Sequence, residues 1–215
     1  MVIGIIVSFA LGMLLSGIWF GLVIALERIS DKCKLYSISR VKSVIAAVIP
    51  TYIILKLNNH YFFNVKSVSD WKAWIEILGV AIITAFIVSK NEVETLPSGK
   101  ELLWYGIDGI FMEIPQRLMM QSFVWCILKQ FKIDNAIVFS VLINAMIWCS
   151  SIIIQNIIFK IKFEKSTVRE IFSSFFFSVG AGYILIKTEF IIFTMIAHLV
   201  ERIVSTRIRG KMHEK

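Results

Sequence analysis

The sequence predicts an all-α protein: a polytopic transmembrane helical bundle with about seven spans. Of its 215 residues, 57% are hydrophobic and 18% are charged, whereas soluble domains are nearer about 45–50% apolar and about 25% charged. The mean hydropathy is +0.77, and apolar runs long enough to cross a bilayer recur along the chain. This composition excludes a disordered chain, collagen, a coiled coil and an ordinary soluble enzyme.

The first apolar run, residues 1–26, has no basic segment before it, so we expect a spanning helix rather than a cleaved signal peptide. A loop is expected over residues 27–42. The second span, 44–57, is short and is expected to be interrupted by Pro50. The third span is 73–89. The loop before it predicts an interfacial aromatic belt of Tyr61, Phe62, Phe63, Trp71 and Trp74.

After a polar loop at residues 90–101, the sequence predicts spans at 102–131, 133–159, 171–186 and 190–203. Three regions follow from this division. They are N-terminal transmembrane helices (1–99), a core (100–205) and a basic cytoplasmic tail (206–215).

The distribution of basic residues predicts the orientation. Loops one, three and five and the tail hold fifteen Lys and Arg residues, against six in the other loops. The positive-inside rule therefore places the N-terminus outside and the C-terminus in the cytoplasm. This orientation also accounts for the net charge of +8 without nucleic acid as a partner. A composition rich in Ile, Lys, Phe and Asn favours a bacterial inner membrane.

Several ionisable side chains lie inside apolar segments. A charge at mid-bilayer costs at least ~2.5–3.5 kcal/mol, so such residues are expected to face the bundle interior or a water-filled cavity, and to be paired. The residues in question are Glu76, Asp108, Glu113, Arg117, His198, Glu201 and Arg202.

Glu113 and Arg117 are four residues apart, so on a helix they share a face and can pair. Pro115 between them is expected to kink the helix and open a polar pocket. His198 shares a face with Arg202 and can act as a general base or donate to an oxyanion. Two structural readings stay open: a pair that holds helices in register, and a histidine bonded within the bundle.

Other motifs are absent from the sequence. No nucleophile, zinc-protease or phosphate-loop pattern occurs, and Cys33, Cys126 and Cys149 have no metal-ligand spacing, so no metal or cofactor is expected. Gly180 and Gly182 predict a close helix crossing.

Taken in order, these residues resemble the CAAX protease and bacteriocin-processing family, also called the Abi family, of intramembrane glutamic-type endopeptidases. The family's Glu-Glu-x-x-x-Arg motif corresponds to Met112, Glu113 and Arg117 here. Its last histidine, followed four residues later by Asn or Asp, corresponds to His198 and Arg202. The stretch 175–198 is similar to the helix and turn that precede that histidine. The resemblance covers residues 100–205, and it implies a catalytic site that includes Glu113, Arg117 and His198.

Two positions depart from the family. Its first glutamate and its middle histidine, which are held to activate water, correspond to Met112 and Ile152. Three functions therefore remain open. The first is a divergent endopeptidase with Glu113 as base and His198 as oxyanion stabiliser. The second is a non-catalytic relative that binds a peptide or protein C-terminus at the membrane, as in bacteriocin self-immunity. The third is a small solute carrier or channel that uses Glu113, Arg117 and His198 as a polar path.

Overall fold

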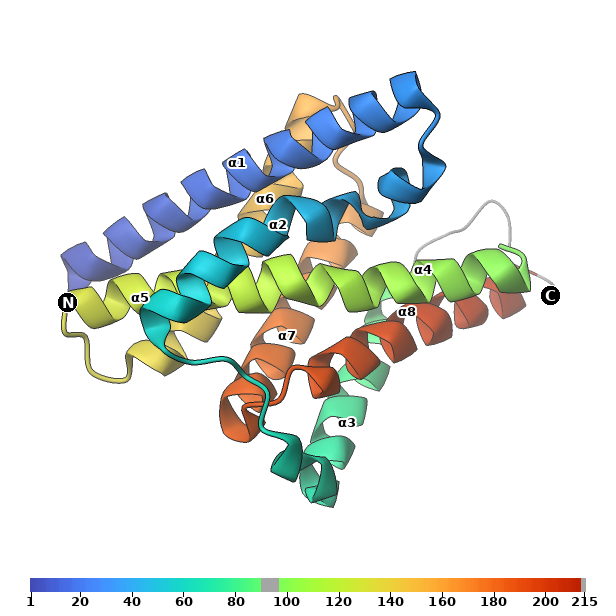
Figure 1. Cartoon of the computed structure of the whole chain (residues 1–215). Helices are drawn as coiled ribbons and strands as arrows, with labels where there is room; N and C mark the ends of the chain where they lie inside the picture. The colour runs from blue at the N-terminus through green and yellow to red at the C-terminus, as the bar shows by residue number, and fades with distance from the viewer. Residues whose placement is uncertain (90–96, 214–215) are drawn as a thin grey trace.

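The computed structural model describes residues 1–89 and 97–213, and over these residues the chain is helical with short connections (Figure 1). An isolated β-bridge joins Phe63 to Phe190. The elements are α1 (Val2–Cys33), α2 (Tyr36–Asn58), η1 (Val65–Ser69), α3 (Trp71–Val88), α4 (Gly99–Glu113), η2 (Ile114–Gln121), α5 (Ser122–Gln130), α6 (Ala136–Ile158), α7 (Lys165–Thr188) and α8 (Ile192–His213).

Five helical stretches in the described residues are long and apolar enough to cross a membrane. They are Val2–Cys33, Ile38–Asn58, Trp71–Val88, Ala136–Ile158 and Lys165–Thr188. Large apolar side chains on their outer surfaces are exposed, as a lipid environment requires; examples are Ile49, Phe86 and Ile157. The predicted membrane protein and its lipid environment are thus supported.

The count of about seven spans is not confirmed. The predicted fourth span is divided into α4, η2 and α5, of 15, 8 and 9 residues. The predicted seventh span lies in α8, which carries Glu201, Arg202, Arg207 and Arg209.

Several helices extend beyond their predicted ends. Most of the loop predicted over 27–42 is helical, because α1 continues to Cys33, Lys34 adopts the left-handed conformation (φ 55°) and α2 begins at Tyr36. α2 also continues through Pro50. Hydropathy misses such extensions, since polar and charged residues beyond the bilayer still form helix and long side chains reach water. Of the loop predicted over 90–101, residues 90–96 lie outside the described part of the chain. The basic tail is helical to His213.

α4, η2 and α5 form one long rod (Figure 1). Its middle, η2, is a π-helical segment, and the disruption predicted at Pro115 takes this form. The backbone N–H of Ser122 donates to the carbonyl of Arg117, five residues earlier, and its hydroxyl lies 3.3 Å from the same oxygen. The wider turn suits a proline, which has no N–H to donate. π-helical turns are frequent at functional sites.

The glycines of α7 lie at close helix crossings, as the sequence predicts. A Cβ at Gly180 would lie 2.6 Å from Cγ2 of Val80 in α3. A Cβ at Gly182 would lie 2.9 Å from Gln121 Oε1 of η2 and from Val141 Cγ1 of α6. α7 therefore packs tightly between α3, η2 and α6.

The predicted aromatic belt is only partly present. Tyr61, Phe63 and Trp71 are 47%, 56% and 64% exposed. Phe62 is buried instead, and its carbonyl accepts a hydrogen bond from the N–H of Ile191 at the start of α8. Trp74 packs on Phe193 with ring centroids 4.3 Å apart. Phe62 thus attaches the loop, and Trp74 attaches the first turn of α3, to the beginning of α8.

Candidate functional site

A buried carboxylate links three helical elements at the centre of the molecule. Arg117 Nε of η2 donates to Glu113 Oε2 of α4 over 3.1 Å, and His198 Nδ1 of α8 lies 2.7 Å from Glu113 Oε1. Glu113 and Arg117 are both 0% exposed, and His198 is 7% exposed. The structure thus brings the three candidate residues of the sequence into one cluster.

The hydrogen bonds assign a tautomer to His198. An ionised carboxylate only accepts, so Nδ1 carries the proton that bonds Glu113. In the neutral ring, Nε2 is then an acceptor, and Arg202 Nε lies 3.4 Å from it. Glu113 therefore orients the imidazole, and its second nitrogen is directed away from the carboxylate.

The cluster extends at both ends. Arg202 Nη1 donates to Asp108 Oδ2 of α4 over 3.1 Å. Arg117 Nη1 donates to the carbonyl and hydroxyl oxygens of Ser178 in α7, each over 3.0 Å. The result is a continuous series of hydrogen bonds from α7 to α8, in which two guanidinium groups are balanced by two carboxylates. Only the Arg117–Glu113 pair is fully buried, as expected of ionised groups inside a bundle. The expectation that Asp108 faces the interior was wrong, because its side chain is 45% exposed and its pair with Arg202 lies at the edge of the bundle.

Gly109 lets α8 approach α4 at the histidine. A Cβ at this position would lie 3.0 Å from His198 Cδ2 and 3.2 Å from both Arg202 Cδ and the His198 carbonyl oxygen. On the other side, the Phe177 ring of α7 packs against the imidazole with centroids 4.8 Å apart. Close packing on both sides fixes the position of His198 beside Glu113.

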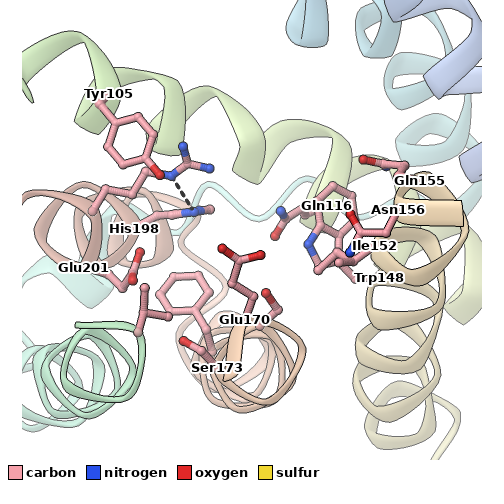
Figure 2. Close-up of a pocket in the computed structure, with 14 residues that line it drawn as sticks. Tyr105, Gln116, Trp148, Ile152, Gln155, Asn156, Glu170, Ser173, His198 and Glu201 are labelled. Carbon is pink, nitrogen blue, oxygen red and sulfur yellow. Dashed lines mark hydrogen bonds between the residues drawn. The ribbon is translucent and has the colours of Figure 1, made fainter. Parts of the chain in front are cut away.

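His198 and Arg202 line a cavity of about 350 Å³ (Figure 2). This volume is within the range of ligand pockets, roughly 300–1,000 Å³. The cavity lies where the ends of α3 and α6, the start of α7 and the first half of α4 meet α8. Most of its polar lining comes from Tyr105, Gln116, Gln155, Asn156, Glu170, Ser173, Ser174 and Glu201. Glu113 is not part of this wall, because it lies behind His198.

Glu170 and Gln116 line the cavity, although neither is among the site residues predicted from the sequence. Glu170 was assigned to a loop, but α7 begins at Lys165 and the carboxylate points into the cavity (Figure 2). A periodic signal was present: Glu170, Ser173, Ser174 and Phe177 have the i, i+3, i+4, i+7 spacing of one helix face, and all four line the cavity.

The two positions where the resemblance fails, Met112 and Ile152, carry apolar side chains that line cavities. Ile152 lines the 350 Å³ cavity. Met112 packs in an apolar cluster and lines a second cavity of about 220 Å³, together with Asp108 and Trp148. Neither side chain can exchange a proton.

The expectation for Glu76 was wrong. It does not face the interior: its carboxylate accepts from Lys187 Nζ at 2.7 Å, with side chains 43% and 36% exposed respectively. The two residues lie near the start of α3 and the end of α7, so the pair is at the bundle surface.

In residues 1–89 and 97–213, no group of three or more His, Cys, Asp or Glu residues is arranged to hold a metal ion. Comparisons with family models, curated proteins and solved structures find no match to the chain.

Proposed function

We propose that the chain is a divergent, non-hydrolytic relative of the CAAX protease and bacteriocin-processing proteins, and that its cavity binds a peptide or protein C-terminus presented at the membrane. The observation that supports this most directly is the state of Glu113. Both of its oxygens are bonded, to Arg117 and to His198, and no part of it is exposed. A carboxylate held in this way orients other groups and has no access to water in the cavity.

The surroundings of His198 also argue against hydrolysis. A general base must take up a proton, and the free acceptor here is Nε2. Arg202 Nε lies 3.4 Å from that atom, so a water molecule at Nε2 would have to compete with this guanidinium for the nitrogen lone pair. The cavity also lacks a base at Ile152. Binding requires only the shape and hydrogen-bonding capacity of the wall, and the amides of Gln116, Gln155 and Asn156 both donate and accept, as peptide groups do.

A solute carrier or channel is less well supported. The polar residues that line the cavity lead to the Glu113–Arg117 pair, but an apolar layer lies beyond it. That layer is formed by Leu55, Phe62, Leu118, Leu185 and Ile191, from the end of α2, the following loop, η2, the end of α7 and the start of α8. A polar path across the bilayer would have to pass through this layer.

Peptide binding can be tested by photocrosslinking in proteoliposomes. With p-benzoylphenylalanine at Ile152, we expect irradiation to attach peptides from a mixture with free C-termini. The same group at Phe176, which is 47% exposed and outside the cavity, should capture none. Failure to crosslink at Ile152 would contradict the proposed binding function.

Mass spectrometry of the same peptide mixture tests the absence of hydrolysis. We expect no new peptide termini beyond those found with protein-free vesicles. New termini produced by the wild type and lost in H198A would identify an enzyme, since removing an acid–base group costs about 10²–10⁴-fold in rate.

We also propose that α4–α5 and α8 complete seven spans, with the N-terminus outside, so that the cavity opens towards the cytoplasm. Cys33, exposed at the end of α1, tests this orientation. A membrane-impermeant maleimide should label it in inverted vesicles and not in right-side-out vesicles, and C33S should lose that label. In a C33S background, S69C, in the exposed loop before α3, should show the opposite pattern. Labelling of Cys33 from the outside would contradict the proposed orientation.

A further inference from the structure

Among the described residues, the carboxylate of Glu170 on the cavity wall has no counter-ion. Arg202 is balanced by Asp108, 3.1 Å away, and its guanidinium lies 4.6 Å from the centre of the Tyr105 ring. Glu201 has an interaction of its own. Within the described part of the chain, no hydrogen bond or ion pair engages the carboxylate of Glu170, which points into the cavity (Figure 2).

Gln116 provides a second, independent observation. This side chain is only 5% exposed, yet within the described residues it forms no hydrogen bond. Its amide is directed into the cavity, towards Glu170 (Figure 2). The amide atoms reach the open space of the cavity, so they are available to hydrogen-bond a partner from outside the protein.

We propose that Glu170 and Gln116 form a subsite for a cationic group, an ammonium or guanidinium, on the bound peptide. This inference rests on the proposed function and adds a specificity to it. Glu170 supplies the counter-ion, and the Gln116 carbonyl accepts a further hydrogen bond. The other amides on the wall, Gln155 and Asn156, are available to the adjoining peptide groups.

The composition of the wall favours a cation over an anion. In the part of the chain that the structure describes, the two arginines at the cavity are already engaged: Arg202 with Asp108, and Arg117 with Glu113 behind the wall. An anion would meet the unpaired carboxylate of Glu170, whereas a cation would form a charge-assisted hydrogen bond with it.

The test uses the full-length protein in detergent micelles and saturation-transfer NMR titrations. The probes are the blocked peptide Gly-Gly-Lys-Gly-Gly, the same peptide with norleucine in place of lysine, and n-butylammonium. We expect the lysine peptide to bind about tenfold more tightly than the norleucine peptide. E170Q should remove this difference. E164Q, at an exposed glutamate outside the cavity, is the matched control and should leave it unchanged.

Within the described residues, the side chains of Glu170 and Gln116 make no hydrogen bonds, so E170Q and Q116L should fold normally. Q116L is expected to weaken binding of the lysine peptide. Equal affinities for the lysine and norleucine peptides, or equal effects of E170Q and E164Q, would overturn the cation subsite. If n-butylammonium binds as tightly as the lysine peptide and is sensitive to E170Q, the subsite stands and the peptide is no longer required. In that case the proposed peptide-binding function would fail while the cation subsite would be kept, so the two proposals can be tested separately.

Discussion

Replacing Arg117 with methionine is expected to lower the free energy of unfolding by about 3–5 kcal/mol, the usual cost of removing one partner of a buried ion pair. The change leaves the Glu113 carboxylate without its counter-ion, although both groups are 0% exposed in the wild type. It also removes both hydrogen bonds from Arg117 to Ser178, and so disconnects α7 from the cluster. Unfolding of the purified protein by SDS in mixed micelles, followed by circular dichroism, measures this loss.

A double-mutant cycle separates the charge from the packing. The double variant E113Q/R117M has no buried charge at either position, and replacing a whole buried pair is often nearly neutral. It should therefore recover most of the stability that R117M loses. K187M breaks the exposed pair with Glu76 and is the control, with only a small expected loss because solvent screens such a pair. A loss for R117M no larger than that for K187M would show that the buried pair is not a main support of the fold.

The members of this cluster could be predicted from the sequence. Glu113 and Arg117 share a face through their spacing, and the cost of placing a charge in a bilayer requires partners for both. The same argument pointed to His198 in a distant segment, and the structure joins it to Glu113 at 2.7 Å. Apolar runs also located the five helices that can cross a membrane. These predictions succeed because insertion energetics act on each segment separately.

The features that were not predicted depend on how helices pack against one another, or on helical residues that extend past the apolar part of a span. Hydropathy places the start of the sixth predicted span at Ile171, which leaves Glu170 in a loop, although α7 begins at Lys165. Glu76 was expected inside, but the proximity of Lys187 depends on how α3 and α7 are paired. At Pro115 the sequence predicted a disrupted helix, but the i→i+5 turn of η2 depends on the surrounding packing. Local sequence does not specify these arrangements.

The second large effect is expected at Gly109, where G109V should lower the free energy of unfolding by about 1–3 kcal/mol, the typical cost of overpacking. A Cβ would lie 3.2 Å from the carbonyl oxygen of His198. A backbone atom cannot rotate aside as a side chain can, so α8 as a whole must move away from α4. G79V is the control, because a Cβ at Gly79 meets nothing within 4 Å.

The displacement should also be visible at the histidine itself. The chain has three histidines, so ¹⁵N-histidine spectra give few signals, and the His198 Nδ1–H bonded to Glu113 should be shifted by E113Q. In G109V this hydrogen-bonded signal should be lost while the ring signals of His60 remain unchanged, and peptide crosslinking at Ile152 should fall as well. If G109V keeps the signal and crosslinks normally, the contact between α4 and α8 does not position the imidazole. Glu113 of α4 holds His198 of α8 by a hydrogen bond inside the bundle, so moving α8 away from α4 breaks that bond. G109V therefore removes His198 from the cavity without changing any residue that lines the cavity.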